Sequence, residues 1–465
     1  MRNFWFWLLP MVFLLPAGRL YAQHEHHKKE QVKKDTTAMH DHAHMQMDHD
    51  TMPAMDHSMH QMSHAYSRNL PMTRNGSGTG WLPDASPMYA YMTSAGKWNL
   101  MLHAALFPRY TTQNFTNKNS YGRGDKFDMP NWFMGMAQKK IGKRGLFNFT
   151  AMISLDPLTE GGSGYPLLFQ TGETYKNQPL VNRQHPHDLI SALAVGYTHA
   201  FSKDVDLSGY FGYPGEPALG PVAFMHRPSA INMPDATLGH HWQDATHILF
   251  GVATLGFRYK IVKLEGSVFT GREPDEHRYD FDRMRFDSYS YRVSVNPNRN
   301  LALQFSQGFL NSPEISHPNE DVTRTTASVI HQYNITDTRF ISTSLIYGLN
   351  TLKHDGERNN EHSFTAETNF QLDKTGVYGR YEFVQKSTEE IALENVGLPQ
   401  SLYNVNALTV GANRRIAKFA KTDLSIGVQA SLNFIPADLE RIYGSTPLNG
   451  QVYLKINPSL MRMKM

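Results

Sequence analysis

The stretch Thr422–Phe434 reads TDLSIGVQASLNF, in which apolar residues alternate with polar residues or glycine. Successive side chains of a β-strand point to opposite faces, so this stretch has one apolar face and one polar face. It is also long enough to cross a bilayer, for which a tilted strand needs about 9–11 residues. The stretch therefore predicts a membrane-spanning β-strand.

The same alternation recurs along the chain, for example in residues 288–295, 341–349 and 377–383. Together these segments predict an all-β fold, a transmembrane antiparallel β-barrel. We expect about 16 strands within a range of 14–18, because boundaries inferred from a pattern carry errors of about two to four residues. The expected strands are 97–112, 129–141, 145–157, 187–201, 205–213, 244–258, 262–272, 284–296, 299–309, 322–335, 338–352, 360–372, 375–387, 403–416, 421–434 and 449–458.

The connections between these strands fall into two alternating sets. The short ones are 142–144, 202–204, 259–261, 296–298, 336–337, 373–374 and 416–420. The long ones are 113–128, 158–186, 214–243, 273–283, 310–321, 353–359, 388–402 and 435–448. Short turns on one rim and long loops on the other are typical of outer-membrane barrels, whose short turns are periplasmic. We therefore expect residues 97–465 to form a barrel in contact with the lipid of the bacterial outer membrane.

Composition agrees with a barrel and excludes other classes. The chain is 40% hydrophobic and 12% aromatic, and no run beyond residue 22 approaches the ~18 apolar residues of a transmembrane helix. The net charge is +3 and the only basic block lies at 28–34, so nucleic acid is not expected as a partner. The chain has no cysteine, which excludes disulfides and thiol chemistry.

No motif supports catalysis. Gly161–Gly164 lacks the spacing of a Gly-x-Ser-x-Gly elbow, and His24–His27 does not continue as His-Glu-x-x-His. We predict no enzymatic activity, no catalytic residue and no residue that binds an organic cofactor. A metal-assisted or carboxylate/histidine hydrolase in the lumen is kept as a minor alternative.

The N-terminal part of the chain differs from the barrel in composition. Residues 1–22 are typical of a secretory signal, with Arg2 before an apolar segment and the small Ala22 before the expected cleavage. Residues 23–74 contain too few large apolar residues to offset the entropy of ordering, so we expect a disordered tail in the periplasm.

The tail is rich in histidine and methionine, with ten and seven of them between His24 and His64. Imidazole suits Cu(II) and zinc, and the thioether of methionine suits Cu(I), so the tail is predicted to bind copper ions in either oxidation state, with zinc as an alternative. The other interpretation is a solvated spacer. The candidate ligands are His40, His42, His44, Met45, Met47, His49, Met52, Met55, His57, Met59 and His60.

Residues 75–96 join the tail to the barrel. Asn75–Gly80 reads NGSGTG, which has the composition of a flexible linker. The aromatic and proline-containing segment 81–96 fits a short plug in the lumen, an additional strand or an interfacial aromatic patch, and the sequence leaves these three open.

The long loops in the first half of the barrel contain candidate metal ligands. Pro186 favours extended backbone at His185, so His185 and His187 point the same way, and Asp188 can serve as a further ligand or as an acceptor for a ring N–H.

A second group of candidate ligands lies between residues 226 and 247. A helical turn there would place His240, Asp244 and His247 on one face. The ordinary alternative is that such side chains are solvated or pair with arginine. All the candidate ligands of the loops are His185, His187, Asp188, His226, His240, His241, Asp244 and His247. Among them, the single cluster that we predict is His185, His187, His240, His241 and His247, although spacing alone does not show that they meet.

The tail segments Met47–Met52 and Met55–His60, followed by a barrel, resemble outer-membrane copper-resistance proteins of the B type. That resemblance implies copper binding or export at the outer membrane, with periplasmic copper-handling proteins as partners. Four barrel segments look instead like a family of uncharacterised exported bacterial proteins. They are Phe169–Thr174, Gln184–Asp188, Gly215–Pro221 and Gly271–Glu276.

Two hypotheses of function follow. In the first, the barrel handles a metal, which is captured by the tail and bound or passed outward by the lumen. In the second, the chain is a general porin or solute channel and its tail is incidental.

Overall fold

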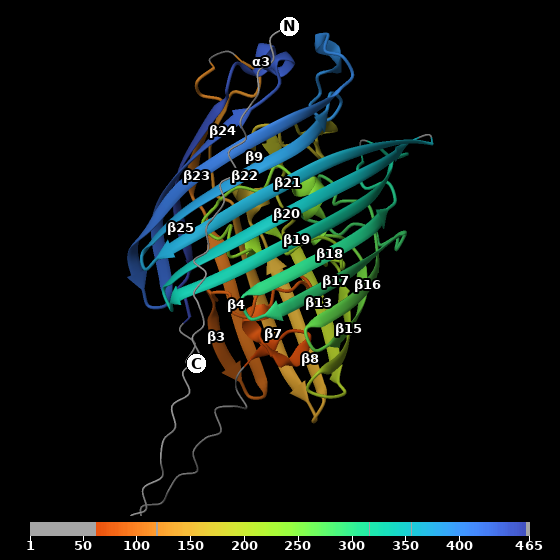
Figure 1. Ribbon diagram of the computed structural model, residues 1–465, viewed down its shortest axis with the longest axis vertical. Helices are drawn as coiled ribbons and strands as arrows, with labels where there is room; N and C mark the ends of the chain where they lie inside the picture. The colour runs from red at the N-terminus through yellow and green to blue at the C-terminus, as the bar shows by residue number, and fades with distance from the viewer. Residues whose placement is uncertain (1–61, 118–119, 316, 355, 462–465) are drawn as a thin grey trace, which may run out of the picture. The chain divides into compact units, whose positions relative to one another are not determined.

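The structure is a computed structural model that describes residues 62–117, 120–315, 317–354 and 356–461. The predicted signal peptide and the candidate ligands of the tail from His40 to His60 lie outside these residues. Within the described residues the strands close into one antiparallel barrel (Figure 1). No helix in this part of the chain is long and apolar enough to cross a membrane.

The wall of the barrel contains long strands joined mostly in sequence order. They are β4 (Trp98–Leu106), β5 (Arg109–Gln113), β6 (Gly124–Asp128), β7 (Asn131–Ile141), β8 (Gly145–Ile153), β13 (Ile190–Ala200), β14 (Val205–Gly212), β15 (Val252–Tyr259), β16 (Val262–Phe269), β17 (Ser288–Asn298), β18 (Leu301–Leu310), β19 (Asp321–Thr336), β20 (Arg339–His354), β21 (Glu357–Leu372), β22 (Thr375–Ser387), β23 (Leu402–Phe419), β24 (Thr422–Phe434) and β25 (Leu448–Pro458).

These strands make sixteen membrane-spanning segments among the described residues, which confirms the predicted fold. The number is sixteen because β4 continues as β5 beyond Pro108 and β6 continues as β7 beyond Pro130. Proline has no N–H and therefore interrupts the ladder of hydrogen bonds. The barrel closes where β25 pairs with β5 and with the end of β4.

The barrel is apolar outside and polar inside. On β24, Val428 is 54% exposed, whereas Gln429 and Asn433, on the other face, are 6% and 2% exposed. A soluble sheet would bury the apolar face, so this arrangement fits a wall that faces lipid.

Most predicted connections agree with the structure, with three differences. The predicted long loop 353–359 is a tight hairpin, because β20 and β21 pair as far as His354 and Glu357. The predicted loop 113–128 is shorter, because β6 occupies Gly124–Asp128. Residues 244–251 are predicted to be part of a strand from their alternation. In the structure they instead belong to a loop that lies inside the barrel.

Shorter elements lie outside the sixteen spans. The strands are β1 (Ser63–His64), β2 (Ser67–Pro71), β3 (Tyr91–Ala95), β9 (Tyr165–Pro166), β10 (Thr174–Tyr175), β11 (Gln178–Pro179) and β12 (Arg183–Gln184). The helices are η2 (Met72–Arg74), α1 (Asp156–Thr159), η3 (Phe224–His226), α2 (His240–Gln243), η4 (Ala245–His247), η5 (Glu394–Val396) and α3 (Ala437–Tyr443).

Residues 62–90 form a plug inside the end of the barrel that carries the short turns, so the prediction of a disordered tail over 23–74 is wrong for residues 62–74. Met62, Tyr66 and Met72 bury apolar side chains in a core cluster, which offsets the entropy of ordering. Arg68 Nη1 donates to the carbonyl oxygen of Gly142 at 3.0 Å, and the Ala85 N–H donates to that of Arg299 at 2.8 Å. Both acceptors belong to short turns between wall strands. Of the three alternatives for 81–96, the structure therefore shows a plug up to residue 90 and an additional strand, β3, paired with β4.

The segment Asn75–Gly80, which its composition predicts to be a flexible linker, is packed within this plug. Ser77 Oγ donates to Glu216 Oε1 at 3.0 Å, and Arg292 Nη2 donates to Thr79 Oγ1 at 2.7 Å. Gly78 has a φ of +50°, and a Cβ there would lie 2.8 Å from Glu216 Cβ. Glycine is needed because the backbone runs directly against another segment.

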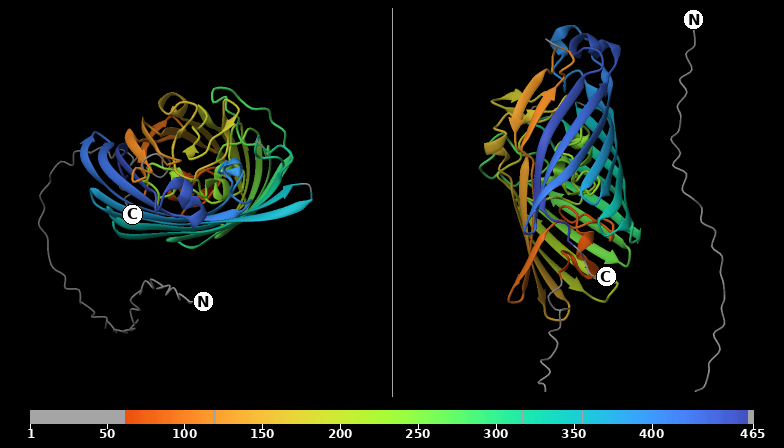
Figure 2. Two further views of the ribbon diagram at one scale, coloured as in Figure 1. Left: turned by 90° about the horizontal axis from the view of Figure 1, so that it is seen from above. Right: turned by 90° about the vertical axis from the view of Figure 1, so that its left-hand side faces the viewer.

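Residues 213–251, here called the lumenal loop, fold back into the barrel instead of extending from its rim. Seen from above, the yellow and green segments between β14 and β15 fill the interior of the barrel (Figure 2). Arg227 holds this loop to the wall, because its Nε lies 2.6 Å from Glu367 Oε1 on β21. The side chains of Arg227 and Glu367 are both fully buried.

Candidate metal centre

The lumenal loop brings histidines from two parts of the sequence together. α2 and η4 supply His240, His241 and His247, and the segment before β13 supplies His185 and His187. We call these five residues the histidine cluster. Their ring centroids form a continuous set of contacts, at 5.5 Å for His187–His247, 5.1 Å for His240–His247, 5.4 Å for His240–His241 and 5.6 Å for His185–His241.

Three rings of the histidine cluster are oriented by an acceptor at Nδ1. His187 Nδ1 lies 2.7 Å from Asp156 Oδ2, His240 Nδ1 lies 2.7 Å from Asp244 Oδ1, and His247 Nδ1 lies 2.8 Å from the carbonyl oxygen of Asp244. An acceptor at Nδ1 fixes the ring and leaves Nε2 to bind a metal, which is the usual arrangement around metal-ligating histidine.

Several ring nitrogens of the cluster have no partner. Nε2 of His187, Nε2 of His247 and both ring nitrogens of His241 are buried without a hydrogen bond. His241 Nδ1 lies 3.3 Å from Glu273 Oε2, but without the geometry of a hydrogen bond. Because an unsatisfied buried polar atom costs about 1–3 kcal/mol, a bound ligand would stabilise the four such atoms gathered in this cluster.

Burial keeps the cluster in the form that binds metal. It lowers the pKa of His185, His240 and His247, and the neighbouring histidines lower the pKa of His185 further. Asp244 opposes the effect of burial on the pKa of His240 without cancelling it. These imidazoles are therefore neutral at pH 7, as metal coordination requires.

Two further loops contact the histidine cluster, and each supplies a carboxylate, Glu173 or Glu273. Glu173 Oε1 lies 3.2 Å from His185 Nε2, and Glu173 also pairs with Arg278. Gly172 packs against the ring of His241, where a Cβ would lie 2.4 Å from Cε1, and its φ of +102° favours glycine. With Glu273, the segments Phe169–Thr174, Gln184–Asp188 and Gly271–Glu276 thus all contribute to the site.

The three remaining loop candidates are engaged with other groups. Asp188 lies 3.5 Å from Arg278 Nη1, and the acceptor of His187 is Asp156 instead. Asp244 orients His240 and accepts Arg227 Nη1 at 2.6 Å, so it supports the site and has no free oxygen for an ion. His226 packs against Trp132 in a neighbouring cavity.

Sequence reasoning missed the residues that support the cluster. Asp156, Glu173 and Glu273 come from three different loops, and no local spacing connects them with a histidine. The available signal was compositional, since all three lie within or beside loops that the sequence already marked as rich in ligand-type residues.

The distances between the rings of the histidine cluster suit one or two metal ions. The rings are not turned so that three of their nitrogens converge on one point, as they would around a bound ion. Imidazoles bound tetrahedrally to one ion have centroids about 5 Å apart, given an ion–nitrogen distance of about 2 Å. Among the described residues, the one group of three side chains whose ligand atoms all lie within 4.8 Å of one another is Asp275, Asp280 and Asp282, which is acidic and partly exposed. Binding by three histidines therefore requires rings of the cluster to turn.

No family model matches this chain, and no curated protein matches it. Among solved structures it is similar to OmpF of Salmonella typhi in complex with daunomycin, at 9% identity and a TM-score of 0.49, over 79% of this chain and 100% of that one. It is also similar to an anion-selective porin from Comamonas acidovorans, at 10% identity and a TM-score of 0.48, over 78% of this chain and 99% of that one. A loop-deletion mutant of OmpT, an outer membrane protein of Vibrio cholerae, matches at 10% identity and a TM-score of 0.46, over 78% of this chain and 100% of that one.

These likenesses concern the fold, which is that of an outer-membrane β-barrel. They give no support to the resemblance to B-type copper-resistance proteins, which stays a prediction.

Proposed function

We propose that this protein is an outer-membrane barrel that binds a transition-metal ion, copper or zinc, on the histidine cluster in its lumen. The observation that carries the proposal is the set of buried ring nitrogens without partners, two of which, Nε2 of His187 and Nε2 of His247, lie on rings whose Nδ1 is held by an acceptor. Imidazole ligands with carboxylates behind them suit Cu(II) and Zn(II). The Met/His tail would collect the ion in the periplasm, on the side of the short turns.

The first test counts metal on two versions of the protein. Deletion of residues 24–61 removes the tail ligands and leaves the plug and barrel intact. After equilibration with Cu(II) or Zn(II) and gel filtration in detergent, the shortened protein is expected to keep about one ion per chain, measured by elemental analysis. A shortened protein without bound metal would place all binding in the tail and overturn the proposal.

The second candidate function is a porin or solute channel. One observation favours it, since sixteen strands enclose a barrel wide enough for an aqueous channel. Against an open channel, the plug and the lumenal loop occupy the interior and bury most of their own residues there.

Conductance in planar bilayers separates the two functions. If the lumen is closed as described, the intact protein is expected to show little conductance, and deletion of residues 24–87 is expected to raise it several-fold by removing most of the plug. A general channel instead predicts large conductance from the intact protein, unaffected by copper and by His185→Ala or His241→Ala. That result would replace the metal proposal by the channel.

A further inference from the structure

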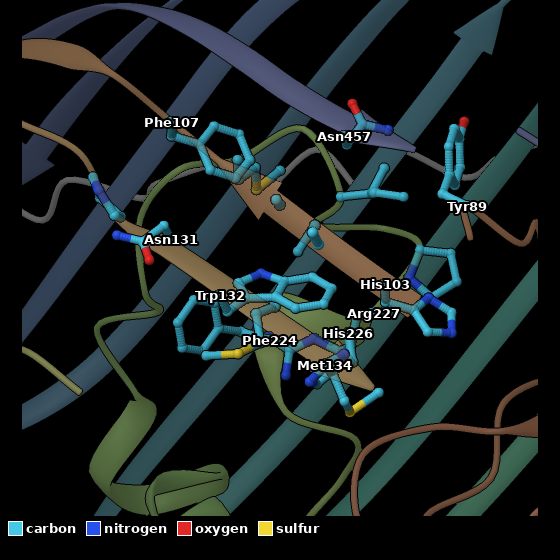
Figure 3. Close-up of a pocket in the computed structure, with 18 of the residues that line it drawn as sticks. Tyr89, His103, Phe107, Asn131, Trp132, Met134, Phe224, His226, Arg227 and Asn457 are labelled. Atoms are coloured by element: carbon cyan, nitrogen blue, oxygen red, sulfur yellow. The ribbon is translucent and has the colours of Figure 1, made fainter. Parts of the chain in front are cut away.

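A second cavity lies beside the histidine cluster and has a different chemistry. It has a volume of about 120 Å³ and lies between β4 and β7 of the wall, the lumenal loop and the end of the plug. Five methionines line it, namely Met88, Met134, Met136, Met225 and Met233. Three histidines, His103, His187 and His226, line it as well. Figure 3 shows His103, His226 and Met134 gathered along one side of it.

The imidazoles that line this cavity keep ring nitrogens without a hydrogen-bond partner in the protein. Within the described residues the ring of His226 has no hydrogen-bond partner, and its ring contact is with Trp132 at a centroid distance of 4.8 Å. His187 directs Nδ1 to Asp156 and leaves Nε2 without a partner. His103 lines the same cavity from β4.

Methionine is often only a flexible filler of apolar cores, and this is the ordinary explanation of such a cluster. Here the inward positions of the wall strands are largely polar, although buried apolar clusters also occur elsewhere in the lumen. The inward positions of β24, for instance, are Asp423, Ser425 and Gln429. A filler would also close the space, whereas a cavity of about 120 Å³ remains beside imidazoles without partners.

The positive charges at the edge of this cavity are engaged with other groups. Arg227 pairs with Asp244 and Glu367, and Lys455 Nζ donates to the carbonyl oxygen of Ile231 at 2.6 Å. A cation in the cavity would therefore meet neutral thioethers and imidazoles, with both neighbouring charges already compensated or hydrogen-bonded.

This cavity shares lining residues with two smaller cavities at the histidine cluster. His187 lines it and also lines a smaller cavity at the cluster, beside Glu173 and Glu273. His226, Met134 and Met136 line it and also line a third cavity, which His247 borders. Three histidines thus each face two cavities, and they connect the plug end of the lumen with the cluster.

We propose that the cavity lined by Met134, Met136, His103 and His226 is a binding site for a monovalent soft cation, Cu(I), separate from the histidine cluster. The inference rests on the proposed function, since it adds to the metal-binding lumen a second site that prefers a monovalent soft cation over a divalent one. Thioether sulfur is a soft, uncharged ligand that favours Cu(I) over Zn(II), while the imidazole-and-carboxylate surroundings of the cluster favour divalent ions. Binding itself transfers no electron.

The test uses Ag(I) as a redox-inert probe for the Cu(I) site and Zn(II) as a probe for the histidine cluster. Both are titrated into the protein without residues 24–61, and bound metal is counted by elemental analysis. Leucine replaces methionine at similar volume, so Met134→Leu with Met136→Leu removes two sulfurs at a small cost in stability. Met101→Leu is the matched control, because Met101 is buried in the same apolar cluster but does not line the cavity.

We expect one Ag(I) per chain in the shortened protein and in Met101→Leu, and at least a tenfold weaker Ag(I) affinity in the double leucine variant, with Zn(II) binding unchanged. X-ray absorption of the silver-loaded protein should show sulfur neighbours that the double variant lacks. Equal Ag(I) affinity in the double variant, or equal losses in Met101→Leu, would overturn the inference. A shortened protein that binds Ag(I) with the expected dependence on Met134 and Met136 but binds no Zn(II) would contradict the proposed function and still support the Cu(I) site.

Discussion

A protein without residues 24–61 that carries both His240→Ala and His247→Ala is expected to lose its bound Cu(II) or Zn(II). The rings of His240 and His247 have the shortest centroid separation in the histidine cluster, 5.1 Å, and both are oriented through Asp244. Removing two of the imidazoles that hold one ion should weaken binding by at least a hundredfold, since no other pair of rings shares this support. Equilibrium dialysis followed by elemental analysis measures the loss.

The matched control for this experiment is His277→Ala. His277 lies in another long loop, its side chain is 70% exposed, and it pairs locally with Asp275. Its removal should leave metal binding unchanged. If the double alanine variant still binds one ion with its original affinity while remaining folded, the cluster is not the metal site.

Arg227→Ala is expected to give the largest loss of stability, about 3–5 kcal/mol of unfolding free energy, as for one partner removed from a buried ion pair. Arg227 Nη1 lies 2.6 Å from Asp244 Oδ2, and Nε lies 2.6 Å from Glu367 Oε1. Without the guanidinium, Glu367 keeps Arg380, whereas Asp244 keeps only His240 and the backbone N–H of Phe224. Urea unfolding of the refolded barrel in detergent, followed by tryptophan fluorescence, measures the change.

Two further variants define the origin of that loss. Arg227→Lys keeps the positive charge without the planar fork, so its stability should fall between that of the wild type and Arg227→Ala. Arg339→Ala removes an arginine from an exposed pair with Asp373 on a short turn, and the unfolding midpoint should barely move. Equal effects of Arg227→Ala and Arg339→Ala would show that the buried network does not hold the lumenal loop.

The barrel could be predicted from local pattern because lipid imposes a period of two on every strand. Thr422–Phe434 shows this directly, since the outward residues that its alternation assigns to lipid are exposed or half-buried in the structure, and none of them is buried. The alternation of short and long connections further predicted which end of the barrel carries the short turns. The errors arose where local pattern and tertiary context disagree, as at residues 353–359, whose polar composition resembles a loop but whose backbone continues a long hairpin.

The candidate site could be predicted only in its parts. The motifs that contain His185, His187 and His240 were visible, but their meeting depends on the lumenal loop turning inward, and that depends on Arg227 reaching Glu367 across 140 residues of sequence. The supporting carboxylates and the methionine-lined cavity had no local signal, because they are assembled from separate loops and strands.

By itself, the sequence determined a sixteen-stranded barrel with an apolar exterior, because hydrogen-bonded strands in lipid must carry their pattern residue by residue. Tertiary structure alone decided that the glycine-rich segment Asn75–Gly80 is part of a packed plug, and that the five histidines expected to cluster do meet in one buried site. The physical reason is that buried ion pairs and close backbone approaches inside the lumen join residues far apart in the chain. Neither kind of contact leaves a periodic trace in the sequence.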